Sequence, residues 1–208
     1  MTQKITALRA QKRTRERVNV YLDEKYAFSL QAILAASLRV GQMLSPADIA
    51  RLRERDSAES VYEKCLGYLS HRPRSQSEIL QYLRRRQVPP ETSSAVIARL
   101  VEAGLLDDQQ FAAYWVENRE SYRPRGIYSL RQELRSKGLS ASAIDEAVQG
   151  VDEEKSALAA ARGYARRLRQ ADRETFRRKL TGFLQRRGFK FETIRQTVEC
   201  VWRETSMG

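Results

Sequence analysis

Cysteine and histidine are scarce in this chain, which has two cysteines and one histidine among its 208 residues. Because Cys65 and Cys200 lie far apart, neither a disulfide framework nor a cysteine-based metal site is expected. Long apolar runs are also missing. Runs such as Ala32–Ala36 are far shorter than the roughly 18 residues that a membrane span requires, and the basic N-terminus lacks the apolar core of a secretory signal. We therefore expect a cytoplasmic protein that has no membrane partner.

The common catalytic motifs are absent as well. The sequence contains no glycine-rich phosphate loop, no GxSxG nucleophile elbow and no HExxH metal pair. We interpret the single histidine, His71, as a solvated residue at the end of a helix. Asp107 and Asp108 could bind a metal, but no third ligand with suitable spacing accompanies them, so we interpret both as helix caps. We expect no cofactor and no metal, and an enzyme is the least favoured class.

Acidic residues are fewer than basic residues in this chain. Lysine and arginine number 38 against 26 aspartates and glutamates, a net charge of +12, while a hydrophobic fraction of 41% is sufficient for a packed core. This net charge is distributed unevenly along the chain: it is +5 for residues 1–56, zero for 57–110, −2 for 111–154 and +9 for 155–208. A surface charged only for solubility would be more uniform. The basic ends favour an anionic partner, such as nucleic acid, an acidic protein surface or an assembly of both.

Alternating polarity predicts a β-hairpin near the N-terminus. Residues 17–22 and 26–30 each alternate between apolar and polar side chains, on either side of Asp23-Glu24-Lys25. A hairpin of this size is marginal alone, so we expect it to pack on another element. Ser45-Pro46 then predicts a short helix that ends at Arg55, because proline is favoured at the first helical position.

From residue 58 to the end, the periodicity is helical and it repeats. Val88, Leu139 and Phe189 stand at the same point of three segments, 51 and 50 residues apart, and an apolar residue follows each of them nine positions later. A further helical stretch precedes each segment. The pattern therefore predicts three three-helix units of about fifty residues, a period typical of helical repeat arrays. Coincidental spacing is the alternative, which the ordered recurrence of helix, turn and helix disfavours.

Helix ends support the repeat. Ser75 and Glu78 have the spacing of a capping box at the start of the first unit's second helix. Gly138 and Gly188 end the corresponding helices of the other two units, where a left-handed residue is expected. The first unit has Gln87 at this position, followed by Val88 and two prolines. The prolines can end the helix, although glutamine adopts the left-handed conformation less readily.

These patterns predict a mainly α protein. We expect an elongated tandem array of three three-helix repeat units, preceded by a short N-terminal β-hairpin and helix. Residues 1–56 form the basic N-terminal segment, 57–110 the first repeat, 111–154 the second repeat and 155–208 the third, basic repeat. We expect the protein to be a monomer.

One part of the sequence is specific enough to identify a family. In chain order it reads Arg72-x-Arg74-Ser75-x-x-Glu78-Ile79-x-x-x-Leu83, then Leu100-x-x-x-Gly104-Leu105-Leu106-Asp107-Asp108-x-x-Phe111-Ala112-x-Tyr114, then Gly126-x-x-x-Leu130-x-x-x-Leu134-x-x-Lys137-Gly138. It resembles the RecX family, the bacterial regulators of the RecA recombinase. The hairpin also resembles the family's N-terminal segment, so the resemblance runs from near Arg17 to the C-terminus. In the third unit it rests chiefly on the repeat pattern.

The resemblance implies a modular, non-catalytic protein that binds in the helical groove of the RecA–single-stranded DNA filament. It implies inhibition of filament growth, ATPase activity and strand exchange, and hence modulation of recombination, DNA repair and the SOS response. The sequence departs from the family at the hairpin turn, which is often Asp-Gly in the family and is Asp23-Glu24 here. A two-residue type I′ turn would require a positive φ at Glu24, so we expect a longer or different turn.

Two sets of residues follow from this interpretation. Candidates for contact with the partner or with nucleic acid are Arg72, Arg74, Arg84, Arg85, Arg123, Arg125, Lys137, Arg166, Arg167, Arg178, Arg186 and Arg187. Residues of the family signature that we assign to the fold are Gly104, Asp107, Asp108, Phe111, Ala112, Tyr114, Gly126, Leu134 and Gly138. Among them, Phe111, Ala112 and Tyr114 are expected to pack between helices.

Two arginines of the third unit receive the sharpest prediction. Phe176, Leu180 and Leu184 define the buried stripe of its second helix. At about 100° per residue, Arg178 lies almost opposite this stripe and Arg186 also lies clear of it. Both guanidinium groups should therefore face solvent and be able to bind carboxylate or phosphate.

A general DNA-binding repeat protein is the main alternative to the filament regulator. Three-helix units resemble the architecture around a helix-turn-helix, so DNA-binding helices remain possible. Such a protein would bind naked duplex with a steep salt dependence and would need no recombinase. Zinc-finger spacing and the aromatic motif of RNA-binding sheets are absent, and the arginine run 84–86 is the closest approach to a helix that reads bases. Evidence for sequence-specific readout is therefore weak.

Overall fold

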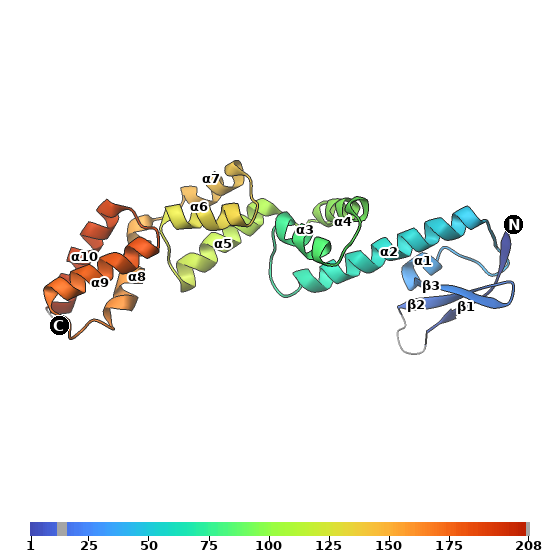
Figure 1. Ribbon diagram of the computed structural model, residues 1–208, viewed down its shortest axis with the longest axis horizontal. Coiled ribbons are helices and arrows are strands. Elements are labelled where there is room, and N and C mark those ends of the chain that lie inside the picture. The colour runs from blue at the N-terminus through green and yellow to red at the C-terminus, as the bar shows by residue number, and fades with distance from the viewer. Residues whose placement is uncertain (12–15, 207–208) are drawn as a thin grey trace. The chain divides into compact units, whose positions relative to one another are not determined.

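The computed structural model describes residues 1–11 and 16–206, which form a four-stranded sheet followed by a succession of helices (Figure 1). The chain divides into two compact units. One unit comprises Met1–Arg72 together with Leu83–Ala103, and the other comprises Pro73–Tyr82 together with Gly104–Gly208. The division therefore falls within the helix that contains both Tyr82 and Leu83.

The sheet belongs to the first unit and is antiparallel throughout. In the spatial order β3-β2-β1-β4, it consists of β1 (Gln3–Ala10), β2 (Arg17–Leu22), β3 (Lys25–Gln31) and β4 (Met43–Leu44). The predicted hairpin is β2 and β3, in which Val20 pairs with Phe28. Strand β1 was not predicted, because its register shifts between Ile5 and Ala7 and the alternation of buried and exposed side chains is lost. The sheet and the short helix α1 (Ala32–Ala35) enclose a core of Ile5, Val20, Leu22, Phe28, Leu30, Ala35, Leu38 and Leu44.

The hairpin turn differs from the prediction. Asp23 and Glu24 both have positive φ, 48° and 69°, so the turn has two residues in the left-handed region and the expected longer turn is wrong. Strand β1 supports this conformation. The backbone N–H of Asp23 donates to the Lys4 carbonyl oxygen at 3.0 Å, and the N–H of Glu24 donates to the Thr6 hydroxyl oxygen at 2.9 Å. These long-range bonds offset the cost of a turn without glycine.

Helix α2 (Pro46–Leu69) is continuous over 24 residues, so the prediction that it ends at Arg55 is wrong. Neither proline nor glycine occurs between Pro46 and Gly67, and nothing in this stretch breaks a helix. The side chain of Ser45 accepts a hydrogen bond from the Asp48 N–H at 3.1 Å, while the Asp48 carboxylate accepts from the Ser45 N–H at 2.9 Å. This capping box fixes the start of the helix.

One helix therefore serves two parts of the first unit. Near its middle, the Asp56 carboxylate accepts hydrogen bonds from the Arg17 side chain and from the Gln31 N–H, each at 2.7 Å, and so ties α2 to the sheet. Further along, Arg99 of α4 (Pro90–Glu102) donates to Glu59 at 2.5 Å, and its guanidinium lies 3.8 Å from the centroid of the Tyr62 ring. Helix α2 is thus both the support of the sheet and a member of the first three-helix domain.

The remaining helices complete three three-helix domains, and the predicted fold class is confirmed. The first domain contains α2, α3 (Gln76–Arg85) and α4. The second contains α5 (Asp108–Tyr122), α6 (Ile127–Ser136) and α7 (Ala141–Gln149). The third contains α8 (Glu153–Ala165), α9 (Arg173–Arg186) and α10 (Phe191–Ser206). Apolar side chains at helical spacing fill the cores of the second domain (Phe111, Ala112, Val116, Leu130, Leu134, Leu139, Ile144, Val148) and the third domain (Ala157, Ala161, Phe176, Leu180, Leu184, Ile194, Val198, Val201).

Within the second unit, successive domains meet through the ends of their middle helices. The hydroxyl of Ser75, just before α3, donates to the carbonyl oxygen of Lys137, the C-cap of α6, at 2.7 Å. In the same way the N–H of Gly126, the N-cap of α6, donates to the carbonyl oxygen of Arg187, the C-cap of α9, at 2.9 Å. The positive end of one helix dipole therefore meets the negative end of the next.

Glycine is required at these two meeting points. Gly138 and Gly188 have φ of +79° and +76°, which confirms the predicted left-handed ends. A Cβ on Gly138 would lie 2.5 Å from the Ser77 hydroxyl oxygen, and one on Gly188 would lie 2.8 Å from the Ser129 Cβ. Gln87 takes the same conformation with φ of +57° at the end of α3 and is exposed. A side chain is therefore tolerated at Gln87, where it points to solvent.

Candidate binding surfaces

Helix α9 carries a cationic face. Phe176, Leu180 and Leu184 are fully buried, and Arg178 and Arg186 are exposed, so the predicted orientation of the two guanidinium groups is confirmed. The surface beside Arg178 has a hollow of about 670 Å³, which is lined by Arg173, Glu174, Arg177, Arg178, Thr181, Gly182 and Gln185. The small residues Thr181 and Gly182 leave room between long cationic side chains, so an anionic group could approach the helix backbone here.

Two of the arginines at this hollow are held by the neighbouring helix. The guanidinium groups of Arg173 and Arg177 lie 3.4 Å and 3.3 Å from the carboxylate of Glu199 on α10. Neither arginine was predicted from the sequence, and their spacing of four, which places them on one side of α9, was the available signal. Arg178 and Arg186 take part in no ion pair among the residues that the structure describes. Together with the exposed Lys179, they are therefore cations of α9 that remain available to a partner.

A second hollow of about 540 Å³ lies between α8 and α10, lined by Arg162, Ala165, Arg166, Arg169, Val201, Glu204 and Thr205. Arg162 donates to both carboxylate oxygens of Glu204, at 3.0 Å and 2.6 Å. This bidentate pair lowers the pKa of Glu204 and raises that of Arg162. Arg166 and Arg167 are exposed at the C-terminal end of α8. Arg166 and Arg167 thus lie in the same domain as α9, but the hollow that Arg166 lines already contains the carboxylate of Glu204.

In the second domain, one carboxylate organises several cations. Glu133 of α6 accepts hydrogen bonds from the Trp115 indole N–H at 2.7 Å and from Arg119 Nε at 2.8 Å. Arg125 Nε lies 2.8 Å from the other oxygen of Glu133 without the alignment of a hydrogen bond. This arrangement joins α5 to α6, so the candidate Arg125 has a structural role in addition to any role in binding. Sequence spacing did not reveal it, because Glu133 is distant from each partner in the chain.

Lys137 is also engaged within the protein. Its ammonium lies 2.6 Å from the Glu78 carboxylate of α3 and 4.8 Å from the centroid of the Trp115 ring. Because Glu78 is only 13% exposed at its side chain, the pair is partly shielded from solvent and anchors α3 against α6. We therefore leave Lys137 out of the contact surface that we propose below.

Three other candidates gather where α9 ends. Arg187 donates to the carbonyl oxygen of Pro124 at 2.9 Å. This places its guanidinium beside the loop Arg123-Pro124-Arg125, which links α5 to α6. Burial lowers the pKa of Arg187, and the positive charges of Arg123 and Arg125 lower it further. The fold thus holds three guanidinium groups close enough to repel one another.

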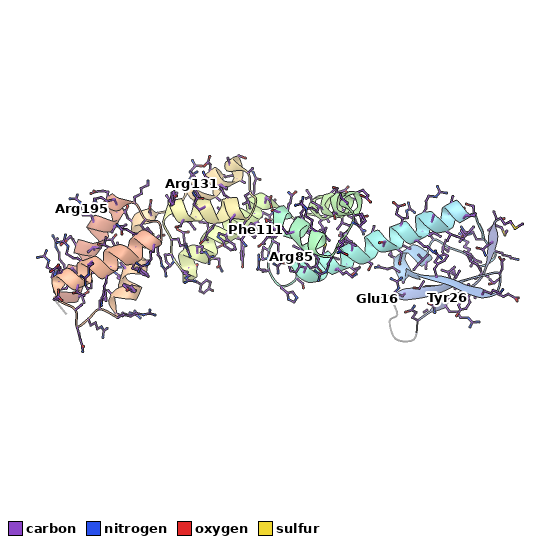
Figure 2. The ribbon with its side chains drawn as sticks, viewed as in Figure 1. Glu16, Tyr26, Arg85, Phe111, Arg131 and Arg195 are labelled. Carbon is purple, nitrogen blue, oxygen red and sulfur yellow. The ribbon has the colours of Figure 1, made fainter. Side chains whose placement is uncertain are left out.

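The remaining candidates lie around α3. Arg84 and Arg85 are exposed in its last turn, and Figure 2 shows Arg85 there, together with Arg131 on α6 and Arg195 on α10. Arg72 and Arg74 lie in the loop before α3, are partly buried and have contacts of their own within the protein. The division between the compact units passes through α3, so we do not combine these four arginines with those of the third domain into one site.

The residues of the family signature occupy structural positions. The Asp107 carboxylate caps α5 by accepting from the N–H groups of Gln109 and Gln110 at 2.8 Å and 3.0 Å. Asp108 instead accepts from the Gln76 N–H at 2.9 Å, so it caps α3 and not its own helix, and burial raises its pKa. Phe111 (labelled in Figure 2), Ala112 and Leu134 are buried, whereas Tyr114 is partly exposed. Gly104 has a positive φ of +67°, and Gly126 and Gly138 lie where successive domains meet.

The part of the chain that the structure describes contains no group of histidine, cysteine and acidic side chains arranged to hold a metal. It also contains no helix whose length and apolar character would let it cross a membrane.

Comparison with known proteins identifies the family. Four family models match in succession: the N-terminal domain of regulatory protein RecX over residues 3–45, and the first, second and third three-helix domains of RecX over residues 62–100, 107–148 and 152–198. The regulatory protein RecX of Bacillus subtilis is 31% identical over 91% of this chain and 74% of its own, and that of Bacillus pumilus is 30% identical over 94% and 76%.

Solved structures agree with this result. A crystal structure of regulatory protein RecX has a TM-score of 0.77 and 29% identity to this chain, covering 95% of this chain and 99% of the other. RecX from Lactobacillus salivarius has a TM-score of 0.60 at 20% identity, covering 70% of this chain and 96% of the other, and shares the fold. The sequence-based prediction of a non-catalytic regulator is consistent with both the family models and the relatives. The chain therefore belongs to the RecX family of regulatory proteins.

Proposed function

We propose that this protein binds the RecA filament on single-stranded DNA, in its helical groove, and inhibits filament growth, ATPase activity and strand exchange. Membership of the RecX family supports RecA as the partner. A tandem array of small domains suits a partner that is itself repetitive, because each domain can meet an equivalent surface. Through this inhibition the protein would modulate recombination, DNA repair and the SOS response.

The exposed cationic face of α9 is the observation that carries the proposal. Residues 155–208 hold a net charge of +9, the largest share of the chain's excess. On α9 the exposed Arg178 lines a hollow that small side chains leave open, and Arg186 is exposed further along the same helix. Guanidinium groups bind carboxylate and phosphate in bidentate fashion, and a nucleoprotein filament presents both. We therefore assign α9 as the main contact surface, with Arg166 and Arg167 contributing from the same domain.

The test is the RecA ATPase reaction on single-stranded DNA, titrated with wild-type protein and with the double variant Arg178→Glu/Arg186→Glu. Exposed substitutions usually change the free energy of unfolding by less than about 0.5 kcal/mol each, so the variant should fold. We expect it to require at least about tenfold more protein for half-inhibition, with the larger loss at low salt, where charges are least screened. Undiminished inhibition by the folded variant across a salt series would refute α9 as the contact surface.

Lys25→Glu/Arg39→Glu is the matched control. Both side chains are exposed in the N-terminal segment, and the control makes the same change in net charge as the test variant. Inhibition should stay close to wild type. If instead both double variants lose inhibition equally, net charge and not the placement of charge would explain the effect.

The same titration separates the proposal from a general DNA-binding function. A filament regulator lowers ATP turnover even when excess naked duplex is present, because its partner is the filament. A general basic DNA-binding protein is removed by the duplex, and it binds duplex in the absence of RecA with a steep dependence on salt. Loss of inhibition on addition of duplex would favour the second function.

A further inference from the structure

Glu199 of α10 divides its carboxylate between two of the arginines that line the hollow on α9. Arg173 Nη2 lies 3.4 Å from one carboxylate oxygen, and Arg177 Nε lies 3.3 Å from the other. Both distances exceed the roughly 2.7–2.9 Å that is typical of a charge-assisted hydrogen bond between nitrogen and oxygen. Two guanidinium groups therefore share one negative charge, and neither is held tightly by it.

Two other carboxylates of α10 form closer pairs. Glu204 accepts hydrogen bonds from Arg162 at 3.0 Å and 2.6 Å, and Glu192 lies 2.8 Å from Arg195 of its own helix. Arg162 and Arg195 thus each have a carboxylate at hydrogen-bonding distance, whereas the two arginines at Glu199 share theirs at a longer distance. The pairing at Glu199 is therefore the one that an incoming anion can break most easily.

The apolar core, and not these ion pairs, fixes α9 against α10. Phe176 of α9 is fully buried, and the centroid of its ring lies 5.1 Å from that of Trp202 on α10. The side chains of Arg173 and Arg177 are 62% and 53% exposed, and that of Glu199 is 31% exposed. Ion pairs this open to solvent contribute little to folding. The two arginines can therefore exchange one anion for another while the helices stay in place.

An anion that enters the hollow meets cations in two different states. Arg178 takes part in no ion pair among the residues that the structure describes, so it can bind the anion directly. Arg173 and Arg177 bind it only if the anion displaces Glu199, so the net gain is the difference between two anions. Glu174 also lines the hollow, but it lies in the first turn of α9, where negative charge stabilises the helix N-terminus.

We infer that Glu199 is a positioning residue that competes with the partner for the α9 hollow. In the free protein it holds Arg173 and Arg177, and on binding it releases both to an anionic group of the partner. The inference rests on the proposed function, in which the α9 face is the contact surface, and it adds an autoinhibitory contact to that face. Glu199 thereby keeps the affinity of the α9 face below the value that its arginines could give.

The test is the affinity of the full chain for RecA filaments on immobilised single-stranded DNA, measured at low and at physiological salt. Glu199→Gln preserves the size of the side chain and removes its charge. It should bind about fivefold more tightly than wild type, because two exposed ion pairs no longer have to be broken. The gain should be larger at low salt, where charges are least screened. If Glu199 only stabilised the domain, the variant would unfold at lower urea and would bind no more tightly, which would overturn the inference.

The two arginines decide whether the mechanism is competition. In the background Arg173→Gln/Arg177→Gln, adding Glu199→Gln should change the affinity by less than about twofold, because no paired arginine is left to release. An undiminished gain in that background would overturn the inference in favour of simple repulsion between Glu199 and the partner.

Glu192→Gln is the matched control. It removes the same charge from the same helix, and Glu192 also pairs with an arginine, Arg195, which does not line the hollow. This control should bind like wild type. A gain equal to that of Glu199→Gln would attribute the effect to net charge and would overturn the inference.

Arg178→Glu/Arg186→Glu, measured in the same titration, separates this inference from the proposed function. If that double variant loses affinity while Glu199→Gln binds like wild type, the α9 face remains the contact surface and the competition is refuted. If both bind like wild type, the proposed surface and the competition are refuted together.

Discussion

Gly138→Ala tests whether the domains of the second unit are joined by direct contact between helix ends. The substitution introduces a Cβ that would lie 2.5 Å from the Ser77 hydroxyl oxygen, at a residue whose φ is +79°. Gly104 provides the matched control, because its φ is +67° but a Cβ there meets nothing within 4 Å. Both substitutions incur the cost of a left-handed alanine, about 1–2 kcal/mol. Only Gly138→Ala adds overpacking, which costs about 1–3 kcal/mol.

We therefore expect Gly138→Ala to be less stable than Gly104→Ala by about 1–3 kcal/mol. The assay is urea unfolding followed by tryptophan fluorescence in a Trp202→Phe background, so that the signal comes from Trp115, which packs on Phe111 with ring centroids 5.8 Å apart. Ser77→Gly should abolish the excess cost, because it removes both atoms that the new Cβ would meet, whereas Ser77→Ala should not, because it keeps one of them. Equal costs for the two glycine substitutions, or no rescue by Ser77→Gly, would refute the junction described here.

Three further predictions concern the cores and the helix caps. Phe111→Ala should cost about 3–5 kcal/mol in urea unfolding, because the side chain is 1% exposed; selective loss of partner binding at unchanged stability would contradict this. At about pH 8 a thiol reagent should modify the exposed Cys200 and spare Cys65, whose pKa burial raises to about 11, until urea unfolds the chain; rapid reaction of both thiols in the folded protein would disprove it. The hydrogen bonds from Ser45 lower the pKa of Asp48 to about 2. The Asp48 carboxylate therefore contributes fully to the stability of the fold above its unfolded pKa of about 3.9, and this contribution is lost as the pH falls towards 2. The stability difference between wild type and Asp48→Asn, measured by circular dichroism, should shrink over that interval, and a constant difference would count against the cap.

The helical part of the fold could be predicted because its information is local. Apolar residues recur at helical spacing, and Gly138 and Gly188 mark helix ends in the sequence as they do in the structure. The same locality explains Gln87. Its left-handed φ is tolerated because its side chain is exposed, whereas the two glycines abut a preceding helix.

Long-range pairing accounts for what sequence reasoning missed. Strand β1 has an irregular register, so it lacks the alternation that revealed β2 and β3. The turn at Asp23-Glu24 adopts positive φ because Lys4 and Thr6, about twenty residues earlier, hydrogen-bond to it. No local rule indicates such a partner.

The candidate surfaces show the same limit. Helical periodicity places Arg178 and Arg186 in solvent, since only their own helix decides this. It cannot show that Lys137 pairs with Glu78 or that Arg125 lies beside Glu133, because these partners belong to other elements. Nor does it bring Arg187 to the loop at Pro124, 63 residues earlier.

Direct binding to the assembled filament tests the central claim most closely. RecA filaments on immobilised single-stranded DNA would be titrated with wild-type protein, with Arg178→Glu/Arg186→Glu and with the control Lys25→Glu/Arg39→Glu, at low and at physiological salt. The proposal predicts that the α9 variant loses at least about tenfold in affinity, more at low salt, while the control binds like wild type. Equal affinity of all three proteins for the filament would contradict it.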